Sequence, residues 1–93
     1  MLNIYFLHAN NCEHCEQALE TIQDAIKKCK NIPCQVTKLL YDTPEALKIA
    51  IDNGIDDLPA FVIGKTSFKG SNYTEASIVE AIKKYGKISH RTH

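Results

Sequence analysis

Two cysteines three residues apart, Cys12 and Cys15, are the residues of this sequence best suited to chemistry, and they stand in the run CEHC. Such a pair can exchange a disulfide with another molecule, bind a soft metal ion, or fill a core as two small hydrophobic side chains. A structural zinc site needs four ligands, and neither a second C-x-x-C nor an H-x-x-x-H follows. The sequence therefore argues against a structural zinc site and leaves two interpretations open at this point: redox chemistry, or a soft-metal module or metallochaperone for Cu(I) or Zn(II).

The two residues between the cysteines would tune the thiols. A protonated or hydrogen-bonding His14 would stabilise a neighbouring thiolate, whereas the negative charge of Glu13 would oppose it. One unit of thiolate pKa corresponds to about 1.4 kcal/mol, and the same free energy corresponds to about 30 mV for a two-electron couple. An exposed histidine with no part in the chemistry is the other interpretation of His14.

An amphipathic helix is predicted to carry both cysteines over residues 12 to 30. Asn11 is the expected N-cap, which puts Cys12 where unpaired backbone N–H groups and the helix dipole stabilise an anion. Cys15 follows one turn later on the same face, within reach of a disulfide. The apolar side of this helix is predicted from the three- and four-residue spacing of Leu19, Ile22, Ile26 and Cys29.

Strands and helices alternate along the rest of the chain in the order β-α-β-α-β-β-α. This order predicts an α/β fold with a mixed four-stranded sheet flanked by helices. The apolar first strand reads as a central strand buried on both faces. The predicted elements are a strand at 2–9, the helix at 12–30, a strand at 32–42, a helix at 44–53, a hairpin around Gly64 and Lys65, and a last helix from Thr74 that Gly86 closes.

The length of 93 residues allows one small domain, which we place at residues 1–86, followed by a flexible tail at 87–93. Eleven basic residues balance eleven acidic ones without a basic stripe, so we expect neither nucleic acid nor membrane as a partner. The first residues lack the pattern of a signal peptide. We therefore expect a cytoplasmic protein, and a monomer.

The sequence resembles the thioredoxin superfamily, in the short form typical of glutaredoxins and glutaredoxin-like thioredoxins. Three pieces carry the resemblance: CEHC as the C-x-x-C, VTKLLYD as the strand after the active-site helix, and NGIDDLPAFVIGKTSFKG. The last piece is the most specific, since its Leu-Pro lies where the family has an apolar residue before a proline, followed by a hairpin and a glycine. The resemblance implies a thioredoxin-like fold and a thiol-disulfide oxidoreductase.

Several residues receive a role only through this resemblance. Pro59 would be the cis-proline that faces the C-x-x-C, and Leu58 would offer its backbone groups to an extended substrate. Lys38 falls where thioredoxins have a partly buried lysine behind the active site, while Phe6 occupies the position of their matching acid. Gly70 is the part of KGSNY that matches the glutathione-binding pattern of glutaredoxins.

The resemblance also implies the partners. Substrates would be protein or small-molecule disulfides, and no dissociable cofactor would be needed beyond the Cys12–Cys15 disulfide. The electron donor would be a flavin-dependent reductase or glutathione. Asn11 stands where thioredoxins keep a tryptophan, and the glutathione pattern is incomplete, so neither donor is singled out.

Two further cysteines, Cys29 and Cys34, flank the turn after the predicted helix. One continues the apolar side of the helix and the other begins a strand, where free cysteine behaves as a small hydrophobic residue. We expect inert core thiols, with a regulatory disulfide across the turn as the alternative. The other histidines show no partner at ligand spacing.

Overall fold

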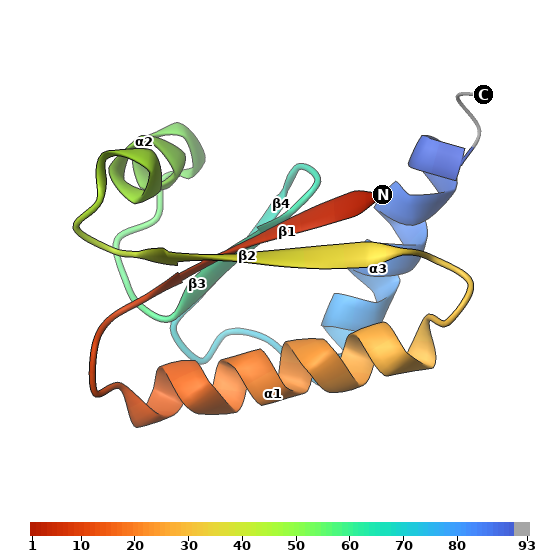
Figure 1. The fold of residues 1–93 in the computed structure, drawn as a ribbon, viewed down its shortest axis with the longest axis horizontal. Helices are drawn as coiled ribbons and strands as arrows, with labels where there is room; N and C mark the ends of the chain where they lie inside the picture. The colour runs from red at the N-terminus through yellow and green to blue at the C-terminus, as the bar shows by residue number, and fades with distance from the viewer. Residues whose placement is uncertain (91–93) are drawn as a thin grey trace.

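The structure is a computed structural model that describes residues 1–90, and its strands and helices follow the predicted order. The predicted fold class is therefore confirmed (Figure 1). The elements are β1 (Leu2–His8), α1 (Glu13–Lys28), β2 (Cys34–Leu40), α2 (Pro44–Asn53), β3 (Ala60–Ile63), β4 (Thr66–Lys69) and α3 (Glu75–His90).

The four strands form one mixed sheet in the order β2-β1-β3-β4. β1 and β2 are parallel, with α1 as the crossover between them, and β3 and β4 are an antiparallel hairpin added beside β1. Phe6 lies in the middle of the sheet, paired with Lys38 on one side and with Phe61 on the other. β1 is thus the strand on which the rest of the sheet is built.

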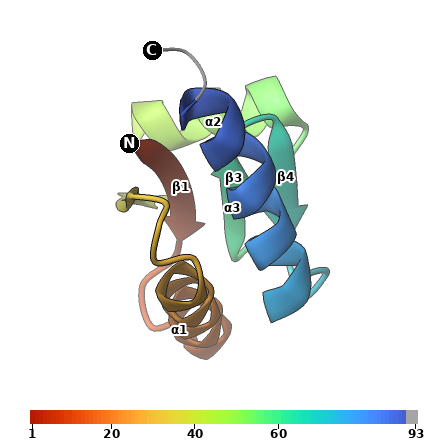
Figure 2. The same ribbon diagram turned by 90° about the vertical axis from the view of Figure 1, so that its right-hand side faces the viewer.

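One face of the sheet is covered by α1 and α3, which pack against each other as well (Figure 2). Small residues, Ala18 and Ala25, alternate with Ile22 along the side of α1 that meets the sheet, and all three are fully buried. Their short side chains allow the helix to approach the strands closely. The main core on this face includes Leu2, Ile4, Phe6, Phe61, Ile63, Ile78 and Ile82.

The opposite face is covered by α2, which packs over Leu7 and Ala60 through Ala46. The expectation that β1 is buried on both faces is wrong for its first half, where Asn3 and Tyr5 are exposed. The reason is that α2 lies over only one end of the strand (Figure 1). Within residues 1–90, no helix is long and apolar enough to cross a membrane.

α3 does not end at Gly86, as predicted, but continues to His90. Gly86 is buried and keeps a helical backbone, and a Cβ built on it would collide with the side chain of Ile32. The glycine therefore allows α3 to pass close to the loop before β2. The first part of the predicted tail is helical, and residues 91–93 lie outside the described residues.

Replacing Gly86 by alanine is expected to destabilise the fold. In a helix interior with free space around it, alanine is more stabilising than glycine by about 1 kcal/mol. Overpacking against Ile32, in contrast, destabilises the folded state by about 1–3 kcal/mol. We expect a net loss of about 1 kcal/mol in the free energy of unfolding, measured by urea denaturation. Ile32→Ala in the same background should recover part of this loss, and a more stable Gly86→Ala variant would contradict the close-packing explanation.

Candidate active site

Cys12 and Cys15 are joined as a disulfide at the start of α1, with their Cα atoms 5.2 Å apart. Cys12, and not the predicted Asn11, is the N-cap: its sulfur accepts a hydrogen bond from the backbone N–H of Cys15 at 3.1 Å. Asn11 instead adopts a left-handed backbone conformation, with φ 54°. The sulfur of Cys12 thus caps the first turn of α1.

The two sulfurs differ in exposure. Cys12 is partly exposed, while Cys15 is 4% exposed and belongs to the main core. After reduction, Cys12 would be the accessible thiol, and the N–H groups of the first turn would stabilise its thiolate. Glu13 and Glu16 in that turn add negative charge, which opposes this effect.

A cavity of about 250 Å³ lies beside the disulfide, between the start of α1 and the ends of β1 and β2. Lys38 and Phe6, the two positions that the resemblance singled out, both line it. His8 and Glu16 also line it, and the sequence had given neither a role at the site. Helical periodicity could have suggested Glu16, because it follows Cys12 by four residues and so lies about one turn further on the same side of the helix.

The second side of the site is the loop before β3, where the Leu58–Pro59 peptide bond is cis. The backbone N–H of Gly70 donates to the Pro59 carbonyl at 2.7 Å and joins this loop to the end of β4. A cavity of about 270 Å³ brings His14 together with Leu58, Pro59 and Gly70. Four of the predicted site residues therefore meet in one place, although they lie far apart in the sequence.

Glu13 is the predicted residue that the structure leaves apart from both cavities: it is exposed on the first turn of α1. The sequence reasoning missed Asp57, Gln17 and Tyr73, which line the cavity beside Pro59. Asp57 directly precedes Leu58, and its position two residues before Pro59 was the available signal. Within residues 1–90, no three His, Cys, Asp or Glu side chains are grouped so that they could hold a metal ion.

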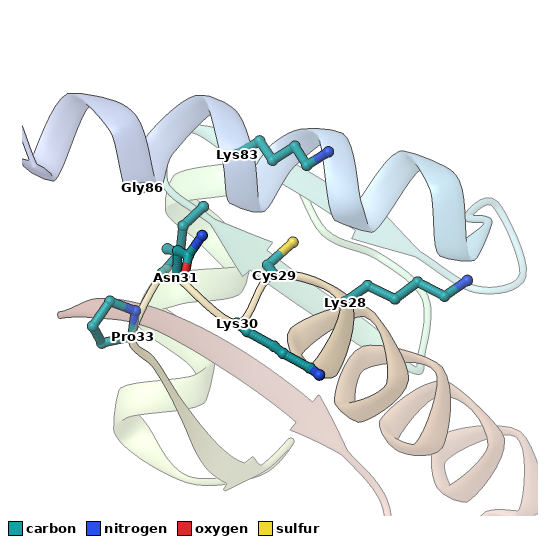
Figure 3. A pocket seen from close by; sticks show the side chains of 8 residues that line it. Lys28, Cys29, Lys30, Asn31, Pro33, Lys83 and Gly86 are labelled. Atoms are coloured by element: carbon teal, nitrogen blue, oxygen red, sulfur yellow. The ribbon is translucent and has the colours of Figure 1, made fainter.

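Cys29 and Cys34 are free thiols at the other end of α1. Cys29 is buried and lines a separate cavity of about 550 Å³, and its sulfur points into the space between the end of α1 and α3 (Figure 3). Burial raises the pKa of the Cys34 thiol, and the nearby Cys29 raises it further. Both effects disfavour the Cys34 thiolate, which fits the expectation that this thiol is inert.

Most of the chain matches a known protein family. The family described as "Thioredoxin domain" matches residues 2–83 of the chain. The chain belongs to the thioredoxin-domain family. The resemblance noted in the sequence is thereby confirmed, and the match includes both cysteines and the whole sheet of this family member. No curated protein matches the sequence.

Solved thioredoxin structures have the same fold. Thioredoxin 1 from Thermosipho africanus superposes with a TM-score of 0.63 at 17% identity, covering 96% of this chain and 99% of that one. The oxidised thioredoxin of Plasmodium falciparum gives 0.60 at 20% identity, with 91% and 81% covered. A thioredoxin from Thermus thermophilus gives 0.60 at 16% identity, with 99% and 83% covered.

The exposure and the thiolate character of the four thiols together predict an order of reactivity in the reduced protein. Cys12 should be alkylated by iodoacetamide about tenfold faster than any other cysteine, since thiolate character and access decide the rate. Time-resolved alkylation followed by peptide mass spectrometry measures all four sites in one sample. Comparable labelling of Cys34 and Cys12 in the folded protein would contradict the assignment of Cys12 as the reactive thiol.

Proposed function

We propose that this thioredoxin-domain protein is a thiol-disulfide oxidoreductase that works through Cys12 and Cys15. The observation that carries the proposal is the disulfide at the head of α1, with one partly exposed and one buried sulfur. The cavity lined by His14, Leu58 and Pro59 supports it, because it offers space for a substrate segment between the cis-proline loop and His14, the residue that stands between the two cysteines in the sequence. Family membership supports the same class of reaction.

The first step is nucleophilic attack by the Cys12 thiolate on one sulfur of a substrate disulfide. A new S–S bond forms between Cys12 and the substrate, the substrate S–S bond breaks, and the second substrate sulfur leaves as a thiolate that takes up a proton. The backbone N–H of Cys15 donates to the Cys12 sulfur at 3.1 Å, so a stabilising donor is already in place for the attacking anion.

The second step releases the substrate. The Cys15 thiol loses its proton and attacks the Cys12 sulfur, the mixed disulfide breaks, and the remaining substrate sulfur leaves as a thiol after protonation. The substrate has then gained two electrons and two protons, and the protein holds the Cys12–Cys15 disulfide. Burial of Cys15 keeps outside disulfides away from the resolving thiol.

We further propose the class of electron donor and the cellular compartment. Reduction of the disulfide requires an external dithiol or thiol, supplied by a flavin-dependent reductase or by glutathione. We place the protein in the cytoplasm, where a reducing pool of this kind is maintained. No dissociable cofactor enters either step, because the two sulfurs carry both electrons.

Two cysteine variants test the reaction. Cys12→Ser should lower insulin-disulfide reduction to the uncatalysed rate, because no nucleophile remains. Cys15→Ser should stop turnover yet accumulate a mixed disulfide with the substrate, visible by mass spectrometry. Cys34→Ser is the matched control and should retain full activity, and unchanged activity in Cys12→Ser would rule out the proposed function.

The residues between the cysteines should move the reduction potential in opposite directions. Glu13→Gln removes a repelling charge, stabilises the thiolate of the reduced form and should raise the potential by about 10 mV. His14→Gln should lower it by a similar amount. Equilibration with a glutathione redox buffer measures both shifts, with Glu20→Gln, further along the exposed side of α1, as the control.

An unchanged potential in His14→Gln would assign His14 to the other interpretation, an exposed histidine without a role. Equal shifts in Glu13→Gln and Glu20→Gln would show that only the net charge of the protein matters.

A further inference from the structure

The cavity beside Pro59 carries an uneven charge. It is lined from three segments: α1 contributes His14 and Gln17, the loop before β3 contributes Asp57 to Pro59, and the segment after β4 contributes Gly70, Ser71 and Tyr73. Asp57 is the carboxylate of this lining, and lysine and arginine are absent from it. A substrate segment in this cavity would therefore meet a negative charge.

The exposed Asp57 carboxylate makes one backbone hydrogen bond and lies next to Gly70. One oxygen accepts a hydrogen bond from the Leu58 N–H at 2.9 Å. The other lies 2.7 Å from the position that a Cβ on Gly70 would occupy, so the carboxylate sits over the glycine. The Gly70 N–H in turn donates to the Pro59 carbonyl. The negative charge thus lies at the junction of the two loops that flank the cavity.

The neighbouring charged side chains do not neutralise the Asp57 carboxylate. The adjacent Asp56 forms an ion pair with Lys69 at 2.8 Å. Among residues 1–90, Asp57 takes part in neither of the two ion pairs. Glu13 and Glu16 add negative charge on the first turn of α1, and His14 is the one side chain of the lining that could carry a positive charge.

We propose that Asp57 is a specificity-determining residue that favours disulfide substrates with a lysine or arginine beside the cysteine and disfavours substrates with a carboxylate there, such as glutathione disulfide. The inference rests on the proposed function and names its substrate class. A carboxylate beside the substrate attracts an ammonium or guanidinium group and repels another carboxylate.

Three peptides with one internal disulfide test this inference, identical except for lysine, serine or glutamate next to the reactive cysteine. The prereduced wild-type protein at pH 8 and low salt should reduce the lysine peptide about fivefold faster than the glutamate peptide. Asp57→Asn keeps an oxygen for the Leu58 N–H but loses the charge, and should lower this ratio about threefold. The ratio cancels any general loss of activity in the variant.

Asp52→Asn is the matched control, because it makes the same change on an exposed position of α2 that does not line the cavity. It should keep the wild-type ratio. In 0.5 M salt the wild-type ratio should shrink, since screening weakens an exposed charge. Glutathione disulfide should be reduced faster by Asp57→Asn than by the wild-type protein, again by about threefold.

The outcomes separate the inference from the function on which it rests. Failure of the wild-type protein to reduce even the serine peptide would overturn the proposed function. Reduction of the serine peptide with an unchanged ratio in Asp57→Asn, or an equal fall of the ratio in Asp52→Asn, would overturn the role of Asp57 alone.

Discussion

The hydrogen bond from the Cys15 N–H to the Cys12 sulfur is the interaction on which the rest of the site depends. A helix start leaves backbone N–H groups without partners, and an oxygen side chain normally accepts from one of them. Here a sulfur has that place. The Cys12 sulfur therefore caps α1 and is also the atom that would react. Because the cap hydrogen bond holds this sulfur against the helix backbone, its position depends on the fold.

The sheet fixes this helix start relative to the cis-proline loop. β1 leads into the loop that carries Cys12, and its antiparallel neighbour β3 begins directly after Pro59. Leu7, near the end of β1, pairs with Ala60, at the start of β3. The loop with the cysteine and the loop with the proline therefore lie at the same end of these two strands. The buried Ala18, Ile22 and Ala25 of α1 hold the helix on this sheet. Packing of a few small residues thus decides the spacing of the two sides of the site.

Features with local causes could be predicted from the sequence. α2 has the predicted bounds because its cap at Thr43, its first-turn Pro44 and its stop at Gly54 are adjacent signals along the chain. Gly86 looked like a similar stop, yet its reason is Ile32, a contact between distant segments that the sequence does not reveal. The N-cap was assigned to Asn11 because asparagine is a common cap, whereas its left-handed backbone shifted the cap to Cys12.

In the candidate site, too, short motifs could be predicted from the sequence, whereas contacts between distant segments could not. The cysteine pair and the Leu58–Pro59 step were visible as short motifs. Asp57 was not, because its hydrogen bond to Leu58 and its place over Gly70 depend on how two loops meet. His8 reaches the cavity beside the disulfide from the end of β1, so its place also depends on how a strand and the start of α1 meet.

The sulfur cap also links folding to electron transfer through a thermodynamic cycle. A thiolate at Cys12 would accept the Cys15 N–H more strongly than a disulfide sulfur does, because charged acceptors make stronger hydrogen bonds. The helix start is then more stable in the reduced thiolate form. Around the cycle, any free energy by which reduction strengthens the folded state must equal the amount by which folding raises the reduction potential of the pair above that of the unfolded chain. In this protein the stability of one helical turn and the tendency of the cysteines to accept electrons are two measurements of one interaction.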